Sequence, residues 1–201
     1  RLVKVGAGTL ELGSQVSGIA SSGVNTFSGG IKIEQGTVLI DGGLNSLGAA
    51  ANIEIGNGVL GFQWNGADMA ADRTFTLTNA NSRISTTSSG SSIIRGVIDG
   101  AGTLNKTNGG KLTLFGANTH QGGTTLTSGT LAIGNSSALG TGAFNIGDGT
   151  SIEGAAAVNV TTNNTINVNG DFSFNSAWYN LTLGNGDFNL GSEQRTITTT
   201  S

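Results

Sequence analysis

Large apolar residues alternate with small or polar residues in many short segments of the chain. Successive side chains of a strand point to opposite faces, so alternation with a period of two predicts strands with one buried face. Thr, Asn, Glu and Lys are expected on the other, outward face. The apolar pairs that define these strands are Ile31/Ile33, Val38/Ile40, Ile53/Ile55, Leu60/Phe62, Phe75/Leu77, Leu112/Leu114, Leu131/Ile133, Phe144/Ile146, Val158/Val160, Ile166/Val168, Phe172/Phe174 and Leu181/Leu183.

Glycine-rich turns separate the predicted strands. The pattern Gly-x-Gly-x-apolar occurs at residues 6–10, 56–60, 100–104 and 184–188, each time where a strand is expected to begin. Many short one-sided strands joined by Gly and Asn turns are typical of a sandwich, a barrel or a solenoid. The alternation alone does not distinguish these three folds.

An internal repeat favours the solenoid. Residues 25–30 (NTFSGG) return as residues 118–123 (NTHQGG), at an offset of 93, and the segments that follow keep this register to within two positions. Upstream, residues 2–12 match residues 104–114 at an offset of 102. The difference predicts about nine extra residues in the first copy, near residues 14–23, which we expect to form a surface loop.

The sequence therefore predicts an all-β fold, a parallel β-solenoid of roughly 8–10 coils that occupies residues 1–201 as one domain. Internal repeats cover about residues 1–93 and 94–185, and a further coil begins at 186–201. Successive coils of a solenoid stack about 4.8 Å apart. Gly and Asn at the corners supply the positive φ angles of tight bends, and stacked Asn side chains can form hydrogen-bonded ladders.

Residues 109–131, followed by residues 135–140, resemble the passenger-associated repeat of Gram-negative autotransporters. The first copy resembles it too, although the extra residues and Val24 depart from the pattern. The resemblance implies a right-handed parallel β-helix on the cell exterior, in the stalk of an adhesin or similar surface protein, with repeats that aid passage through the outer membrane. The repeat residues that carry it are Asn25, Thr26, Gly29, Gly30, Gly36, Thr37, Leu47, Gly48, Gly110, Leu112, Leu114, Asn118, Thr119, Gly122, Gly123, Gly129, Thr130, Leu131, Leu139 and Gly140.

Composition is consistent with a folded, exported chain. Gly, Thr, Asn and Ser fill 102 of 201 positions, but Leu, Ile, Val and Phe number 50, enough for a core. Pro and Cys are absent. Proline would remove a donor from the ladder in every coil, and disulfide formation or prolyl isomerisation would delay a chain that is threaded outward.

Charge points to no electrostatic partner. Nine basic and twelve acidic residues are scattered along the chain, without the basic patch of a nucleic-acid-binding protein. No run of 18 apolar residues is present, so we expect no membrane span in this chain.

Few residues are suited to chemistry, and we expect no catalytic or cofactor-binding residue and no enzyme activity. His120 is the only histidine, and Phe27 takes its place in the first copy, which indicates a packing or corner position. Asp148, Asp171 and Asp187 lie beside Gly or Asn turns, where an Asp side chain normally bonds its own backbone. No metal site is expected, and calcium remains the one cofactor left open.

The aromatic residues leave two interpretations. Phe62 and Trp64 share one face and belong either to the core or to a shelf on which sugars stack; Trp178 and Tyr179 are the other prominent aromatics.

The leading functional hypothesis is a structural β-helical stalk or spacer of a bacterial cell-surface or secreted protein. The alternative is a subunit of an extracellular fibre assembled end to end, because residues 1–4 begin inside a Leu-x-Lys motif and residues 196–201 lack a recognisable cap. Expected partners are neighbouring β-helical segments of a parent chain or other copies, and a host surface or glycan is a further option.

Overall fold

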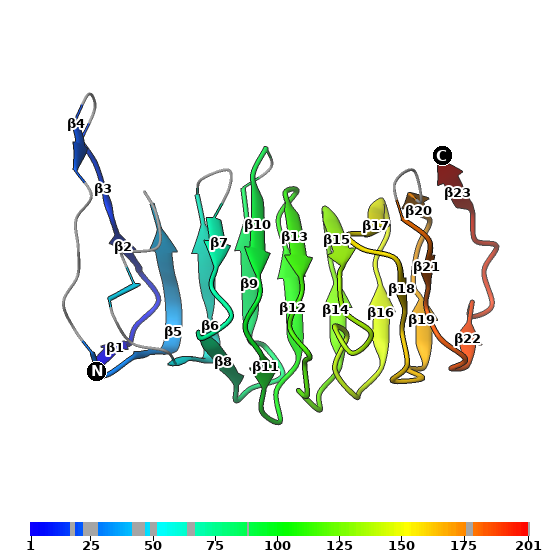
Figure 1. The fold of residues 1–201 in the computed structure, drawn as a ribbon, viewed down its shortest axis with the longest axis horizontal. Coiled ribbons are helices and arrows are strands. Elements are labelled where there is room, and N and C mark those ends of the chain that lie inside the picture. Colours follow the sequence, from blue (N-terminus) through cyan, green and yellow to red (C-terminus); the bar gives the residue numbers. More distant parts are fainter. Residues whose placement is uncertain are drawn as a thin grey trace.

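The computed structural model describes residues 1–16, 19–21, 28–41, 47–48, 52–63, 67–87, 89–175 and 179–200. This part of the chain is a stack of β-coils, with the two termini at opposite ends of the long axis (Figure 1). In the described residues, no helix has the length and apolar character needed to cross a membrane. The all-β solenoid predicted from the sequence is confirmed.

The larger sheet has twelve strands, and all of its pairings are parallel. Its main path contains β1 (Leu2–Lys4), β5 (Ile31–Ile40), β6 (Asn52–Phe62), β9 (Arg83–Thr86), β12 (Leu104–Thr107), β14 (Thr124–Leu126), β16 (Phe144–Ile146), β19 (Ile166–Val168) and β22 (Phe188–Asn189). Three further strands, β2 (Thr9–Leu12), β8 (Thr74–Leu77) and β11 (Ile98–Asp99), pair beside this path.

The second sheet has seven strands, also parallel, and a small third sheet flanks it in the C-terminal half. The second sheet contains β7 (Ala67–Met69), β10 (Ser91–Ile94), β13 (Lys111–Leu114), β15 (Thr130–Ile133), β17 (Thr150–Gly154), β20 (Phe172–Asn175) and β23 (Ile197–Thr200). The third sheet pairs β18 (Val158–Asn159) with β21 (Leu181–Thr182). One coil therefore contributes a strand to each of two or three faces.

Register fixes the length of a coil. Paired residues in adjacent strands of the second sheet are between 19 positions apart, as in Leu112 and Leu131, and 25 positions apart, as in Ala67 and Ser92. The sequence repeat of 92 to 93 residues thus corresponds to about four coils. The seven strands of the second sheet mark about seven turns in the described residues, fewer than the 8–10 coils predicted from the sequence.

Apolar residues stack in columns inside the coils. Ile31, Ile53, Phe75 and Ile98 are paired in succession, and each is at most 1% exposed. Removing a side chain of this size from water stabilises the fold by about 1.5–3 kcal/mol. Because each column continues from one coil to the next, the core is a single long cluster.

Strands β5 and β6 are longer than the alternation predicted. The sequence indicates separate strands around Ile33 and Val38, but pairing continues through the corner between them, where Gly36 faces Gly58. The alternation of buried and exposed side chains is nevertheless interrupted at the corner. Each of these strands therefore consists of two segments, and each segment has its own inward-facing apolar residues. The corner bends the strand without interrupting the parallel ladder.

The extra residues of the first copy contain a hairpin. β3 (Ser14–Val16) and β4 (Ile19–Ser21) pair antiparallel and project from the N-terminal end of the stack (Figure 1). An insertion within a coil cannot enter the parallel ladder without displacing a coil residue. Its strands therefore pair with each other.

Candidate functional site

A buried lysine holds a corner of the second repeat. Lys106 lies in β12 and is fully buried. Its Nζ donates to the carbonyl oxygens of Thr107 at 3.0 Å, Asn108 at 2.6 Å and Ser128 at 3.1 Å. Burial lowers the pKa of this ammonium to about 8, so it is still mainly protonated at neutral pH. The expectation that Lys side chains face outward is wrong here.

Lys4 has the same arrangement in the first repeat. Its Nζ donates to the carbonyl oxygens of Val5 at 2.9 Å, Gly6 at 2.6 Å and Gln35 at 3.2 Å. In both copies the ammonium bonds its own turn and the turn of the next coil. We call this arrangement of Lys4 or Lys106 with its three carbonyls the lysine clamp. The alternation of the sequence does indicate an inward position for this lysine. Lys106 lies two residues after Leu104 in the same strand, so both side chains point to the same face.

A glycine with positive φ follows each clamp. Gln35 and Ser128 directly precede Gly36 and Gly129, whose φ angles are 71° and 77°. A Cβ on Gly36 would lie 2.4 Å from the carbonyl oxygen of Gly6, and one on Gly129 would lie 2.5 Å from that of Asn108. Only glycine fits this corner without displacing the backbone that the lysine bonds.

Two further pairs of repeat glycines also have matched positive φ angles. The values are 79° for Gly30 and 80° for Gly123, then 67° for Gly48 and 68° for Gly140. Residues aligned between the two sequence copies therefore adopt the same backbone conformation at these corners.

Asn118 bonds two neighbouring coils from inside a turn. Its side chain is 1% exposed; Oδ1 accepts from the backbone N–H of Ile98 at 2.8 Å, and Nδ2 donates to the carbonyl oxygen of Ala138 at 2.7 Å. Asn164, 2% exposed, acts similarly in a later turn, donating to the carbonyl oxygens of Gly140 and Gly142. These amides satisfy backbone groups that a turn would otherwise leave unpaired inside the protein.

His120 is a buried hydrogen-bond donor. Its Nε2 lies 3.0 Å from Oγ1 of Thr124, and the hydroxyl of Thr124 donates to the carbonyl oxygen of Leu139 at 2.9 Å. Because that hydroxyl hydrogen is committed to Leu139, Nε2–H of His120 must donate to Thr124. Burial lowers the pKa of His120 to about 4, so the ring is neutral at neutral pH.

Replacing His120 by Phe, the residue aligned with it in the first repeat, is expected to reduce the acid sensitivity of the fold. The unfolded imidazole binds a proton near its ordinary pKa of about 6.5, whereas the folded one does so only near 4. Stability from this group is therefore present above pH 6.5 and is lost as the pH falls toward 4, by about 2 kcal/mol between pH 7 and pH 5. Urea unfolding at both pH values measures the difference; an equal loss in both proteins contradicts the assignment.

The turn aspartates bond the next coil. Oδ1 of Asp148 accepts from the backbone N–H of Asp171 at 3.0 Å, and Oδ1 of Asp171 accepts from that of Thr196 at 2.8 Å. The expectation that they bond their own backbone is wrong, because stacking places the amide of the next turn within reach. Asp187 is exposed. Among the residues described, no three His, Cys, Asp or Glu side chains gather closely enough to hold a metal ion.

A ladder of Asn side chains follows the outward face of the larger sheet. Asn145 donates to Thr125 at 3.2 Å, Asn167 donates to Asn145 at 2.8 Å, and Asn189 donates to Asn167 at 3.4 Å. The ladder lies on the outward face of the strands, one of the two places where the sequence predicts Asn, the other being the corners.

The remaining repeat residues have structural positions. Leu47, Leu112, Leu114, Leu131 and Leu139 are core side chains, Gly110 is buried, Thr37 and Thr130 are half-buried in strands, and Gly29, Gly122 and Thr119 are exposed. Asn25, Thr26, Trp64 and Trp178 lie outside the described residues. Phe62 belongs to the core at 2% exposure, and Tyr179 is 46% exposed.

These corners define a class of protein: a parallel β-solenoid in which buried polar side chains bond the backbone of neighbouring coils. A family model described as the passenger-associated-transport-repeat matches residues 2–40 and 104–133, the two segments that contain the lysine clamps. The chain carries this autotransporter passenger repeat.

The chain is also similar to a curated protein, the Adhesin BmaC autotransporter of Brucella suis biovar 1 (strain 1330). The two are 33% identical over an alignment of 180 residues, and the match covers 71% of this chain and 5% of the relative. The chain thus spans only a small part of that relative's length. No solved structure matches the chain.

Proposed function

We propose that this chain is a structural stalk segment of a passenger exposed on the surface of a Gram-negative bacterium, and that its repeat coils assist outward secretion. The observation that carries the proposal is the parallel pairing of successive coils along the whole stack. A rod of this kind holds other parts of a longer protein at a distance. The adhesin name of the relative and the transport repeat support a structural role over an enzymatic one.

The geometry supplies a physical route to secretion. Each coil leaves a row of unpaired backbone groups that the next coil satisfies, so folding can proceed one coil at a time along the chain. The lysine clamp and Asn118 add buried bonds between a new coil and its neighbours. Coils that fold outside the cell cannot slide back through a pore, which makes folding a source of directional movement.

Deleting one repeat coil from a full-length parent protein tests the role in secretion. Removal of residues 118–139 is expected to lower surface exposure several-fold, because it eliminates Asn118 and the corner at Gly129. The matched control removes residues 144–165, a coil outside the two family matches, at the register where Phe144 pairs with Ile166. Surface labelling of intact cells, normalised to total protein, measures the result.

The control separates secretion from mere length. A loss confined to the repeat deletion supports the proposal, since both deletions shorten the stalk by about one coil. Equal labelling of both deletions would show that the repeat coils have no special part in export, and the secretion role would then be abandoned.

A fibre subunit is the second candidate, and one surface favours it. Phe188, Leu190 and Ile197 in the last coils are 48%, 43% and 42% exposed. A following coil, from a longer parent chain or from another copy, would cover them and extend both sheets. Electron microscopy is the test: unbranched filaments that a Phe188→Glu variant abolishes support this candidate, and dispersed particles contradict it.

A further inference from the structure

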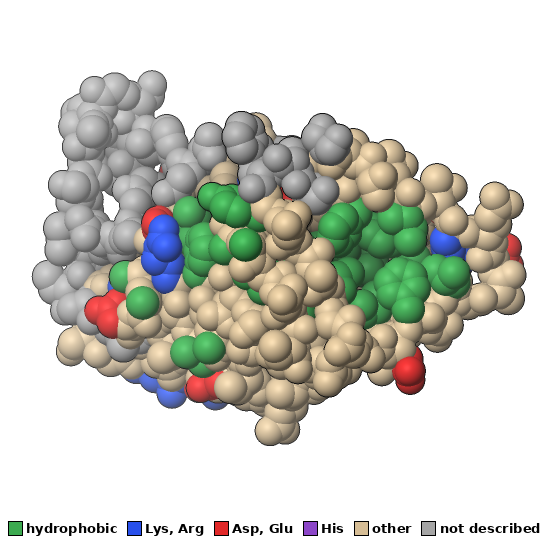
Figure 2. Space-filling model, turned by 45° about the vertical axis from the view of Figure 1, so that its right-hand side comes forward, with side chains coloured by type: hydrophobic (Ala, Val, Ile, Leu, Met, Phe, Trp, Pro, Cys, Tyr) green, Lys and Arg blue, Asp and Glu red, His purple; other side chains and the backbone are tan. Residues whose placement is uncertain are grey.

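A groove of about 520 Å³ lies on the outer face of the second sheet, across β10, β13, β15, β17 and β20. Its floor follows one register row in which Ile93, Thr113, Ala132 and Glu153 are paired in succession. The volume falls in the range of small-molecule sites, about 300–1,000 Å³. The face of the molecule shown in Figure 2 is mostly neutral polar, with hydrophobic patches and few charges.

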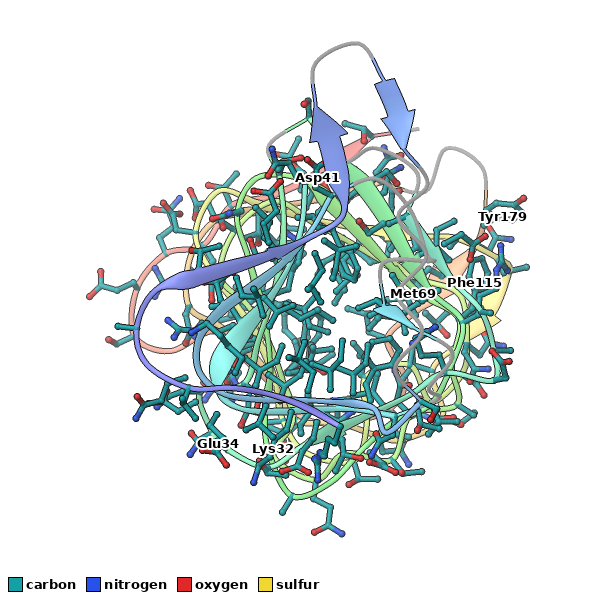
Figure 3. The ribbon with its side chains drawn as sticks, turned by 90° about the vertical axis from the view of Figure 1, so that its left-hand side faces the viewer. Lys32, Glu34, Asp41, Met69, Phe115 and Tyr179 are labelled. Carbon is teal, nitrogen blue, oxygen red and sulfur yellow. The ribbon has the colours of Figure 1, made fainter. Side chains whose placement is uncertain are left out.

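Two aromatic side chains line the groove. Phe115 and Tyr179 lie on the same outer side of the molecule when it is viewed along its long axis (Figure 3). The guanidinium of Arg95 covers the Phe115 ring at 5.0 Å from the centroid. The ring also lies over Gly134, where a Cβ would come within 2.4 Å of Cδ1. The absence of a side chain at Gly134 therefore makes room for the Phe115 ring itself, which forms a fixed apolar wall at this end of the groove.

The polar groups of the groove are balanced in charge. Nζ of Lys111 lies 2.7 Å from Oε1 of Glu153, and their side chains are 42% and 21% exposed. The pair crosses the β15 strand between them, so a donor and an acceptor stand side by side over Ala132. Arg95 is likewise paired, with Asp68 at 2.7 Å. The charged side chains of this face thus present hydrogen-bonding capacity with no net charge.

We propose that this groove binds a linear neutral oligosaccharide, a function beyond that of a stalk. A sugar ring has an apolar C–H face that packs on an aromatic ring and a rim of hydroxyls that bond carboxylate and ammonium groups. Three coil steps, from Phe115 through Gly134 and Ala155 to Tyr179, span about 14 Å. This length accommodates a short oligosaccharide with one end near Phe115 and the other near Tyr179.

Two other ligand classes fit less well. An acidic glycan needs a cation free of a carboxylate partner, and both Lys111 and Arg95 are paired with one. A peptide added as a strand needs an open sheet edge, and β13, β15 and β17 at the centre of the groove are paired on both sides. The neutral saccharide uses the aromatic walls and the polar floor together.

Binding of the whole chain to an array of neutral, sialylated and sulfated oligosaccharides tests the proposal, followed by calorimetry with the strongest neutral hit. Tyr179→Ala is expected to weaken binding at least tenfold, because Tyr179 is the exposed aromatic of the groove. Phe115→Leu and Glu153→Gln are each expected to weaken it several-fold, since Arg95 already covers the Phe115 ring. The matched control is Phe188→Ala, which removes a similarly exposed aromatic outside the groove. Melting curves confirm that each variant is folded; Tyr179→Ala provides the test if Phe115→Leu fails to fold.

The outcomes are distinct from those of the secretion experiment. Neutral binding that Tyr179→Ala weakens and Phe188→Ala preserves supports the groove. Three results would overturn the proposed saccharide site: binding only to acidic glycans, binding that neither Tyr179→Ala nor Phe188→Ala changes, or no binding at all. None of these results bears on the role of the chain as a stalk.

Discussion

Replacing Lys106 by Met is expected to lower the free energy of unfolding by about 3 kcal/mol. Met keeps most of the side-chain volume among the core residues but leaves the carbonyl oxygens of Thr107, Asn108 and Ser128 without their donor. Each buried acceptor that loses its partner costs about 1–3 kcal/mol. Two effects offset part of the total cost of the three carbonyls: the buried charge is removed, and water can reach the exposed side of the turn. Urea unfolding at pH 7 measures the change.

Lys111→Met is the matched control for this substitution. Lys111 is 42% exposed and is paired with Glu153 in solvent, so its loss is expected to change the free energy of unfolding by less than about 1 kcal/mol. Lys4→Met should resemble Lys106→Met, because its ammonium bonds three carbonyls in the same way. A Lys106→Met protein as stable as the Lys111→Met protein contradicts the clamp.

The coils could be predicted because their signal is local and repeated. An inward column such as Ile31, Ile53 and Phe75 needs only an apolar residue at the inward-facing position of each coil. The alternation of apolar and polar residues identifies these positions directly. The corners were equally readable where two aligned glycines, such as Gly36 and Gly129, require the same positive φ. Because the coils stack in register, the inward positions of one coil predict those of the next.

The buried polar contacts were harder to predict because their partners come from other coils. Lys106 was expected to face outward on the basis of its charge, although its parity with Leu104 indicates the interior. Once it is inside, its charge is compatible with the core because a turn directs carbonyl oxygens at Nζ. Asp148 likewise bonds a residue 23 positions away, a partner visible only after the coils are in register.

The groove had no sequence signal at all. Phe115 and Tyr179 are 64 positions apart in the sequence, and the length of the coils between them brings both to one face. The aromatic alternation suggests a sugar-stacking shelf only around Phe62 and Trp64. A ligand surface on a solenoid is assembled from equivalent positions of several coils, so single-strand patterns do not reveal it.

Replacing Asn118 by Leu is expected to cost about 4 kcal/mol of unfolding free energy, more than Lys106→Met. The amide is nearly isosteric with the Leu side chain, so packing changes little, but the N–H of Ile98 and the carbonyl of Ala138 both lose buried partners. These two groups belong to the coils on either side, and the loss therefore weakens both junctions of one coil.

Asn145→Leu is the control, because Asn145 belongs to the outward ladder and is half-buried. Its partners Thr125 and Asn167 can bond water, so a change of less than about 1 kcal/mol is expected. Urea unfolding of the two variants should differ by about 3 kcal/mol. Equal losses would mean that the turn amide contributes no more than a surface ladder, and that apolar columns alone hold adjacent coils together.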